Sequence, residues 1–132
     1  MLTGGCFCGA VRYEASGPVS SQAMCHCTMC RGTSGAPCVA WFTVPARAFK
    51  FISGQPTRFR SSGHACRTFC PACGTQLTFA DDGSPGEIDV TTCSLDAPAE
   101  LPLQVHIFTR SQIPWLTLGD GLPRYPGSHN DS

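Results

Sequence analysis

Short stretches in which apolar and polar residues alternate, typical of strands with one buried face, recur along the chain. In the stretch GAVRYEA, residues 9–15, Val11, Tyr13 and Ala15 fall on one side of an extended backbone. The apolar run CVAWFTV, residues 38–44, lies between two prolines and is typical of a strand covered on both faces. The same criteria predict further strands in residues 47–53, 57–61, 75–80, 87–95 and 103–109.

Helices have little room in this sequence, because its 132 residues include 14 glycines and 11 prolines. The one tolerable candidate is a turn or two near Cys27 to Thr33, and Gly32 interrupts even that segment. We therefore predict an all-β fold built from small antiparallel sheets. There is no repeat of fixed period and no linker, so we expect a single domain over residues 3–125. Residues 126–132 have the composition of a frayed polar tail.

The formal net charge is zero, which argues against the diffuse attraction to phosphates on which nucleic-acid binding depends. Basic residues nevertheless gather before Cys70 and acidic residues after it. Either strands from the two halves interleave and the charges cancel on folding, or the basic half compensates an anionic thiolate–metal centre and its ligand. No stretch has the pattern of a secretion signal or a membrane helix. We expect a cytoplasmic protein with no membrane partner.

Ten cysteines are more than a domain of this length needs for folding, since its core buries enough surface without disulfides. Several stand in C-x-C or C-x-x-C pairs. In a reducing cytosol such pairs favour metal binding or catalysis over a disulfide framework, which only a secreted protein would favour.

The segment FCPACG carries Cys70 and Cys73 at the spacing of a zinc knuckle, with Gly74 able to close the turn. Near the start of the chain, CFCG places Cys6 and Cys8 on the same side of an extended segment. Taken alone, that pair could be two small buried residues. Beside an incomplete knuckle it supplies the two thiolates that a closed structural zinc site requires.

The segment CHCTMC sets Cys25, Cys27 and Cys30 around His26 within six residues. If Cys25 and Cys27 share one side of the backbone, His26 points away from them and is a neighbour rather than a ligand. Three protein ligands with one open position are the arrangement of a catalytic zinc.

A fourth cysteine would instead make this second site structural. The candidates are Cys38, Cys66 and Cys93. Cys38 lies in the apolar run and Cys93 in a predicted strand, where both would be inert buried thiols. Cys66, four residues before the knuckle, is the strongest rival for the open position.

Four segments together resemble, in order and spacing, the glutathione-dependent formaldehyde-activating enzyme family, which includes centromere protein V-like proteins. These segments are residues 4–15, 25–37, 63–77 and 105–126, and the likeness runs from about Thr3 to Tyr125. The resemblance implies an all-β, tent-like fold pinned by two zinc ions. It also implies a structural site and a catalytic site, whose ligands are respectively Cys6, Cys8, Cys70 and Cys73, and Cys25, Cys27 and Cys30.

Charge indicates what the second zinc would do. Three thiolates leave the centre at a formal charge of −1, so it is a weaker Lewis acid than a zinc held by three imidazoles and prefers a further sulfur ligand. A thiolate held there would add to a small aldehyde to give an S-hydroxymethyl adduct, or release one in reverse. This agrees with the carbon–sulfur lyase activity, on formaldehyde and glutathione or a similar thiol, that the resemblance implies.

Two arginines, Arg31 and Arg67, are candidates to balance charge at this site or to meet carboxylates of the thiol; the alternative is that they are exposed residues. His64 and His106 are interpreted as ordinary polar residues rather than bases. The competing functional hypothesis is a non-enzymatic, zinc-stabilised module that binds protein, with nucleic acid disfavoured by the balanced charge.

Overall fold

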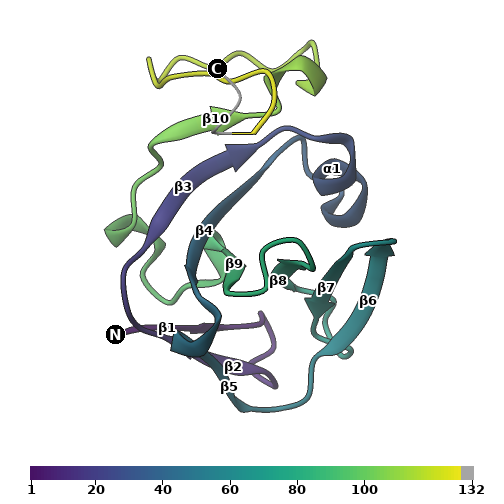
Figure 1. The fold of residues 1–132 in the computed structure, drawn as a ribbon, viewed down its shortest axis with the longest axis vertical. Coiled ribbons are helices and arrows are strands. Elements are labelled where there is room, and N and C mark those ends of the chain that lie inside the picture. Colours follow the sequence, from purple (N-terminus) through teal and green to yellow (C-terminus); the bar gives the residue numbers. More distant parts are fainter. Residues whose placement is uncertain (129–132) are drawn as a thin grey trace.

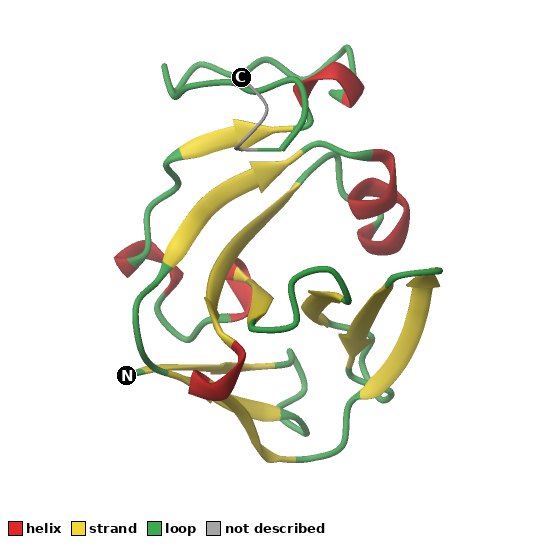
Figure 2. Ribbon diagram, in the orientation of Figure 1, coloured by secondary structure: helices red, strands yellow, loops and turns green. Residues whose placement is uncertain are grey.

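The computed structural model describes residues 1–128, and strands make up most of its regular secondary structure (Figure 2). The predicted all-β class is confirmed. In chain order, the strands are β1 (Leu2–Gly5), β2 (Arg12–Ala15), β3 (Ser20–Cys25), β4 (Val39–Pro45), β5 (Phe49–Ser53), β6 (Thr57–Ser62), β7 (Ala65–Phe69), β8 (Gln76–Asp81), β9 (Glu87–Thr91) and β10 (Val105–Ile107). The α-helix α1 (Thr28–Ser34) and four 3₁₀ turns, η1 (Ala46–Ala48), η2 (Thr92–Ser94), η3 (Pro98–Glu100) and η4 (Thr109–Ser111), complete the elements.

The strands form two sheets of unequal size. A three-stranded antiparallel sheet has the order β1-β2-β5, and a seven-stranded sheet has the order β10-β3-β4-β9-β8-β7-β6. The larger sheet exceeds the small sheets expected from the sequence, and its edge strand β10 pairs in parallel with β3. Figure 1 shows the three-stranded sheet at the foot of the molecule, with β3 and β4 rising from it toward α1.

The main core lies between the two sheets. Phe42, Val44 and Val90 of the larger sheet are essentially inaccessible to solvent and pack in one cluster with Val11 and Tyr13. Burial raises the pKa of the Tyr13 hydroxyl to about 12, although a hydrogen bond of 2.7 Å to Ser94 partly offsets this effect. On the opposite face of the larger sheet, near α1, Trp41 packs in a smaller cluster with Cys25 and Cys30.

Three strands were not predicted, and each of them leads into one of the segments that carry the clustered cysteines. Strand β3 has a bulge between Ser20 and Ala23, with Ser21 at a φ of 50°, and this bulge breaks the alternation of apolar and polar residues. Strand β7 contains Arg67, whose side chain is buried, although an arginine in a sequence normally indicates an exposed position. Strand β1 ends in two glycines, which normally disfavour strands; a Cβ at Gly4 would lie 2.5 Å from the Ser94 carbonyl.

The predicted helix is confirmed at α1, and its two ends have clear causes. The Cys27 sulfur accepts the N–H of Cys30 at the start of the helix. Gly35 ends the helix in the left-handed region with a φ of 72° and donates its N–H to the Arg31 carbonyl. No helix in residues 1–128 is long and apolar enough to cross a membrane.

Two predicted strands are shorter than expected. Strand β9 stops at Thr91 and the chain turns into η2, so Cys93 is exposed rather than buried in a strand. Strand β10 is limited to Val105–Ile107 and is followed by η4. Of the tail predicted from residue 126, Gly127 accepts a hydrogen bond of 2.8 Å from the Phe108 N–H, and residues 129–132 lie outside the described part of the chain.

Charges from the two halves of the chain meet on folding. Arg12 forms a two-pronged contact with Asp96, and Arg60 pairs with Asp82. Each arginine lowers the pKa of its partner carboxyl. These pairs support the interpretation that much of the charge asymmetry cancels in the folded protein.

The turn between β5 and β6 packs against the loop that follows the first cysteine pair. Gly54 has a φ of 79°, and a Cβ there would lie 2.0 Å from the Ala10 carbonyl oxygen. We expect Gly54→Ala to lower the free energy of unfolding by about 2 kcal/mol or more, because both the left-handed backbone and the contact oppose a side chain. Urea denaturation measures this. Gly63→Ala is the control, since its Cβ would meet open space; equal stability of the two variants would contradict the expectation.

Candidate functional site

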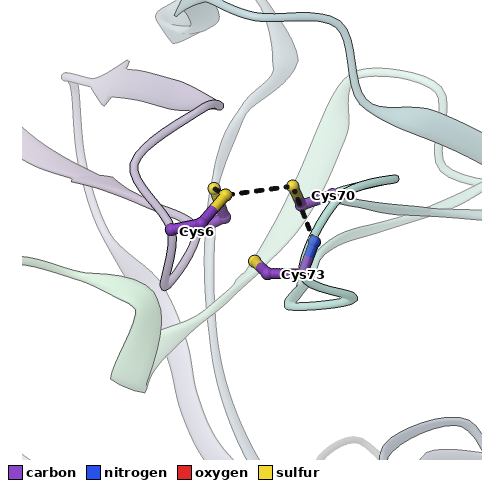
Figure 3. A group of neighbouring side chains, drawn as sticks. Cys6, Cys70 and Cys73 are labelled. Atoms are coloured by element: carbon purple, nitrogen blue, oxygen red, sulfur yellow. Dashed lines mark hydrogen bonds between the residues drawn. The ribbon is translucent and has the colours of Figure 1, made fainter.

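Four cysteine side chains from distant parts of the sequence meet at the edge of the main core. Cys6 and Cys8 lie in the loop after β1, and Cys70 and Cys73 in the turn after β7. Their sulfur atoms all lie within 4.8 Å of one another. Figure 3 shows the labelled side chains of Cys6, Cys70 and Cys73 turned toward a common point. The structure therefore brings the two predicted pairs together.

The turn at Cys70 has the geometry expected of a knuckle. Gly74 takes a φ of 81° and donates its N–H to the Cys70 carbonyl at 2.8 Å. The N–H groups of Ala72 and Cys73 point at the Cys70 sulfur at 3.4 and 3.5 Å. Hydrogen bonds from the side chain and backbone of Thr75 lower the pKa of the Cys73 thiol to about 5. The turn thus stabilises sulfur in its thiolate form, which is the form that binds metal.

The spacing of these sulfurs fits a zinc ion. Sulfurs placed tetrahedrally at about 2.3 Å from one zinc are separated by about 3.8 Å. The Cys6 and Cys8 sulfurs are 3.6 Å apart, and those of Cys8 and Cys70 are 3.8 Å apart. Cys6 and Cys70 are buried in the main core, so a metal here would join the first strand to the middle of the chain.

A second group of sulfurs lies at the junction of β3 and α1. Cys25 is the last residue of β3, Cys27 caps the helix and Cys30 lies in its first turn. Their sulfurs lie within 4.8 Å of one another, and those of Cys30 and Cys25 are 3.3 Å apart. Within residues 1–128, no other cysteine, histidine or carboxylate joins this three-cysteine cluster.

Interactions inside the three-cysteine cluster favour one ionised sulfur. Contacts with the neighbouring thiols, Cys25 first and Cys30 second, lower the pKa of the Cys27 thiol to about 2. The same contact with Cys27 raises the pKa of Cys25. A divalent metal would complete the deprotonation, since thiols bind zinc as thiolates.

The remaining cysteines stay apart from both groups. Cys66 and Arg67 are neighbours on β7 and so point to opposite faces of the sheet. Cys66 lines a cavity of about 200 Å³ on the face toward the three-stranded sheet, together with Phe49, Phe51 and Thr68. All ten cysteines are free of disulfides. The alternative in which Cys66 closes the second group is therefore not supported by the geometry.

Arg67 extends from β7 toward the three-cysteine cluster. Its Nη2 lies 3.8 Å from the Cys30 sulfur and its Nη1 lies 3.4 Å from the Thr33 hydroxyl. The guanidinium lies 4.9 Å from the centroid of the Phe79 ring and 5.8 Å from that of Trp41. The side chain is only 3% exposed. This outcome excludes the alternative that Arg67 is an exposed strand residue.

Arg31, the other arginine singled out from the sequence, does not reach the sulfurs. Its guanidinium donates to the Ser111 carbonyl in η4, and it thereby braces the helix against the C-terminal segment. His64 is 71% exposed and lies 3.4 Å from an Asp81 oxygen, in agreement with an ordinary polar role.

A buried histidine pair behind the three-cysteine cluster was missed by the sequence interpretation. His26 Nε2 lies 2.9 Å from His106 Nδ1, and His106 Nε2 lies 2.7 Å from an Asp120 oxygen. Both histidines are almost inaccessible, and burial lowers the pKa of His26. The His26 N–H also bonds the Ile107 carbonyl, so β10 holds the segment between Cys25 and Cys27 in place. No local signal reveals this pair, because 80 residues separate its members.

The order and spacing of the two cysteine groups match a known family. A profile described as glutathione-dependent formaldehyde-activating enzyme matches residues 1–111, most of the chain. The chain belongs to this family. The recognition made from the cysteine motifs is thus confirmed, and the match includes all seven clustered cysteines.

Individual relatives agree with this family membership. The chain is 32% identical over 77 residues to an uncharacterised lyase of Schizosaccharomyces pombe. That alignment covers 58% of this chain and 56% of the yeast protein, so the chain spans little more than half the length of this relative. A Rhodobacter sphaeroides protein of known crystal structure superposes with a TM-score of 0.61 at 18% identity, over 93% of this chain and 98% of that one. The latter likeness establishes a shared fold.

Proposed function

We propose that this protein is a zinc-dependent carbon–sulfur lyase that forms and cleaves the S-hydroxymethyl adduct of formaldehyde with glutathione or a similar thiol. The observation that carries the proposal is the three-cysteine cluster, which gathers three sulfurs and no fourth side-chain ligand from residues 1–128. Family membership supports the reaction type, and the name of the yeast relative supports a lyase.

We assign different roles to the two cysteine groups. Cys6, Cys8, Cys70 and Cys73 would hold a structural zinc, because four sulfurs close the coordination shell. Cys25, Cys27 and Cys30 would hold a catalytic zinc. An ion bound there would supply an open position that lowers the pKa of an incoming thiol and keeps it as a thiolate at neutral pH. Free thiols at both sites suit a reducing compartment, and we propose the cytoplasm.

The reaction itself is an addition that balances without a further reactant. The thiol gives up its proton, its sulfur forms a bond to the carbonyl carbon of formaldehyde, and the oxygen takes up a proton. Cleavage reverses each of these changes. The chain would orient the bound thiol, because the three cysteines are held at the junction of β3 and α1, and it would supply a positive charge at Arg67.

A second candidate is a zinc-stabilised module that binds another protein. Two exposed aromatic side chains favour it, because Phe7, between Cys6 and Cys8, is 93% exposed and Trp115 is 71% exposed. Net charge of zero continues to disfavour nucleic acid. This candidate requires no open metal position, so the response of the metal to thiols distinguishes the two.

Cobalt substitution tests the proposed function. In protein loaded with Co²⁺, we expect glutathione to change the visible absorption spectrum, because sulfur would replace oxygen as the fourth ligand at the three-cysteine site. S-methylglutathione is the matched control, since a thioether has no proton to lose. A spectrum indifferent to glutathione would leave the binding module as the better account.

A further inference from the structure

Arg67 is a buried cation beside the three-cysteine cluster. It is 3% exposed, and none of the ion pairs formed within residues 1–128 includes it. Among the described residues, its Nε has no hydrogen-bond partner. A charge in this position is costly unless an opposite charge compensates it. The question is therefore which negative charge Arg67 serves.

The surroundings of Arg67 hold it in one orientation. Phe79 of β8 and Trp41 of β4 present aromatic rings to the guanidinium, an arrangement that attracts cations electrostatically. Thr33 at the end of α1 contacts Nη1, while Nη2 points at the Cys30 sulfur. These neighbours come from three elements, β4, β8 and α1, so the positive charge is held beside the three-cysteine cluster.

Other charges near Arg67 are negative or engaged elsewhere. A cleft of about 170 Å³ is lined by Phe79, which also contacts Arg67, and by the acidic residues Asp81, Glu87 and Asp89. Asp89 is bonded to the Thr43 hydroxyl at 2.6 Å. Arg31 is bonded to the Ser111 carbonyl. Arg67 attracts the Asp89 carboxylate, which partly offsets the rise in the pKa of Asp89 caused by burial. It forms no ion pair with Asp89 within residues 1–128, whereas its Nη2 lies 3.8 Å from the Cys30 sulfur, so Arg67 is placed to compensate negative charge at the cysteines.

A charge count gives Arg67 a specific role. Three thiolates and one divalent metal sum to −1, and Arg67 brings the local sum to zero. An incoming thiolate then changes the local charge from zero to −1, whereas without Arg67 the local charge would change from −1 to −2. We infer that Arg67 is the residue that lets the open position accept an anionic ligand, and so selects thiolates over neutral ligands. This inference rests on the proposal that the three-cysteine cluster holds a metal with an open position.

Ligand binding to the full chain loaded with Co²⁺ tests the inference without an activity assay. The probes are 2-mercaptoethanol, which binds as a thiolate, thiocyanate, an anion that is not a thiol, and imidazole, a neutral ligand. We expect Arg67→Met to weaken both anionic probes by about tenfold or more, the size of one charge-assisted hydrogen bond, and to leave imidazole within about twofold. Arg67→Lys keeps the charge and should restore most of the lost affinity.

Arg58→Met is the matched control. Arg58 lies on β6 opposite Thr68, on the other face of the sheet from Arg67, and its loss changes the net charge equally. It should leave all three affinities unchanged. If Arg67→Met does not fold, Arg67→Gln takes its place, because it removes the charge and keeps a side chain that can donate a hydrogen bond. Loss of charge predicts weaker binding of the two anionic probes only, whereas a role in packing alone predicts loss of all three probes together.

The outcomes separate this inference from the proposed function. Anionic probes that bind equally to wild type and Arg67→Met, or a uniform loss of all three probes in that variant, would overturn the role of Arg67 while leaving thiol activation intact. If wild type ignores 2-mercaptoethanol but binds thiocyanate in an Arg67-dependent way, the role of Arg67 stands and thiol activation fails.

Discussion

Replacing Cys70 by serine should leave a chain that does not fold stably. Cys70 is fully buried in the main core, and its sulfur lies 3.8 Å from that of Cys8 in the first loop. The binding of a structural zinc contributes about 10–16 kcal/mol, as much as the whole stability of a typical domain of about 5–15 kcal/mol. We expect loss of soluble protein, of the cooperative melting transition in circular dichroism and of bound zinc.

Cys66→Ser is the matched control for this prediction. It exchanges the same atoms four residues earlier, in a strand that leads into the same turn, but Cys66 belongs to neither cysteine group. The control should stay folded and keep both metals. A Cys70→Ser protein that melts like wild type would show that the four-cysteine group carries no structural metal.

Replacing Cys27 by serine should abolish activity and leave the fold intact. Cys27 caps α1 by accepting the N–H of Cys30, and serine is a preferred residue at such a position. The helix therefore keeps its start while the three-cysteine cluster loses one sulfur. We expect a folded protein with one zinc per chain instead of two, and formation of the S-hydroxymethyl adduct at the spontaneous rate.

The two cysteine variants together test the division of roles. Metal analysis and circular dichroism of Cys70→Ser and Cys27→Ser should give opposite results, an unfolded chain in the first case and a folded chain lacking one metal in the second. If both variants unfold and lose all metal together, the assignment of one structural and one catalytic site is wrong.

The two cysteine groups were accessible to prediction because their signals are local. In the pairs C-x-C and C-x-x-C, the two sulfurs are close in sequence and therefore close in space, whatever the strand arrangement. Structural zinc takes four protein ligands, and this preference predicted that Cys6 and Cys8 would meet Cys70 and Cys73. The structure brings the same seven sulfurs together in the same two groups.

The surroundings of the two cysteine groups were not accessible to prediction, because they depend on pairings between distant segments. Strand β3 is bulged, so its sequence lacks the alternation that identifies strands. The contact of His26 with His106 arises only because β10 pairs in parallel with β3. The inward orientation of Arg67 follows from the register of β7 against β8, which places Arg67 opposite Phe79. Without knowledge of that register, the sequence does not show which face of the sheet Arg67 points to.

The most direct measurement is the rate at which glutathione and ¹³C-formaldehyde exchange with their S-hydroxymethyl adduct, followed by carbon NMR with and without the zinc-loaded protein. The account predicts exchange faster than the spontaneous reaction with wild type, and exchange at the spontaneous rate with Cys27→Ser at the same concentration. Exchange at the spontaneous rate with folded wild-type protein that holds both zinc ions would contradict a thiol-activating lyase.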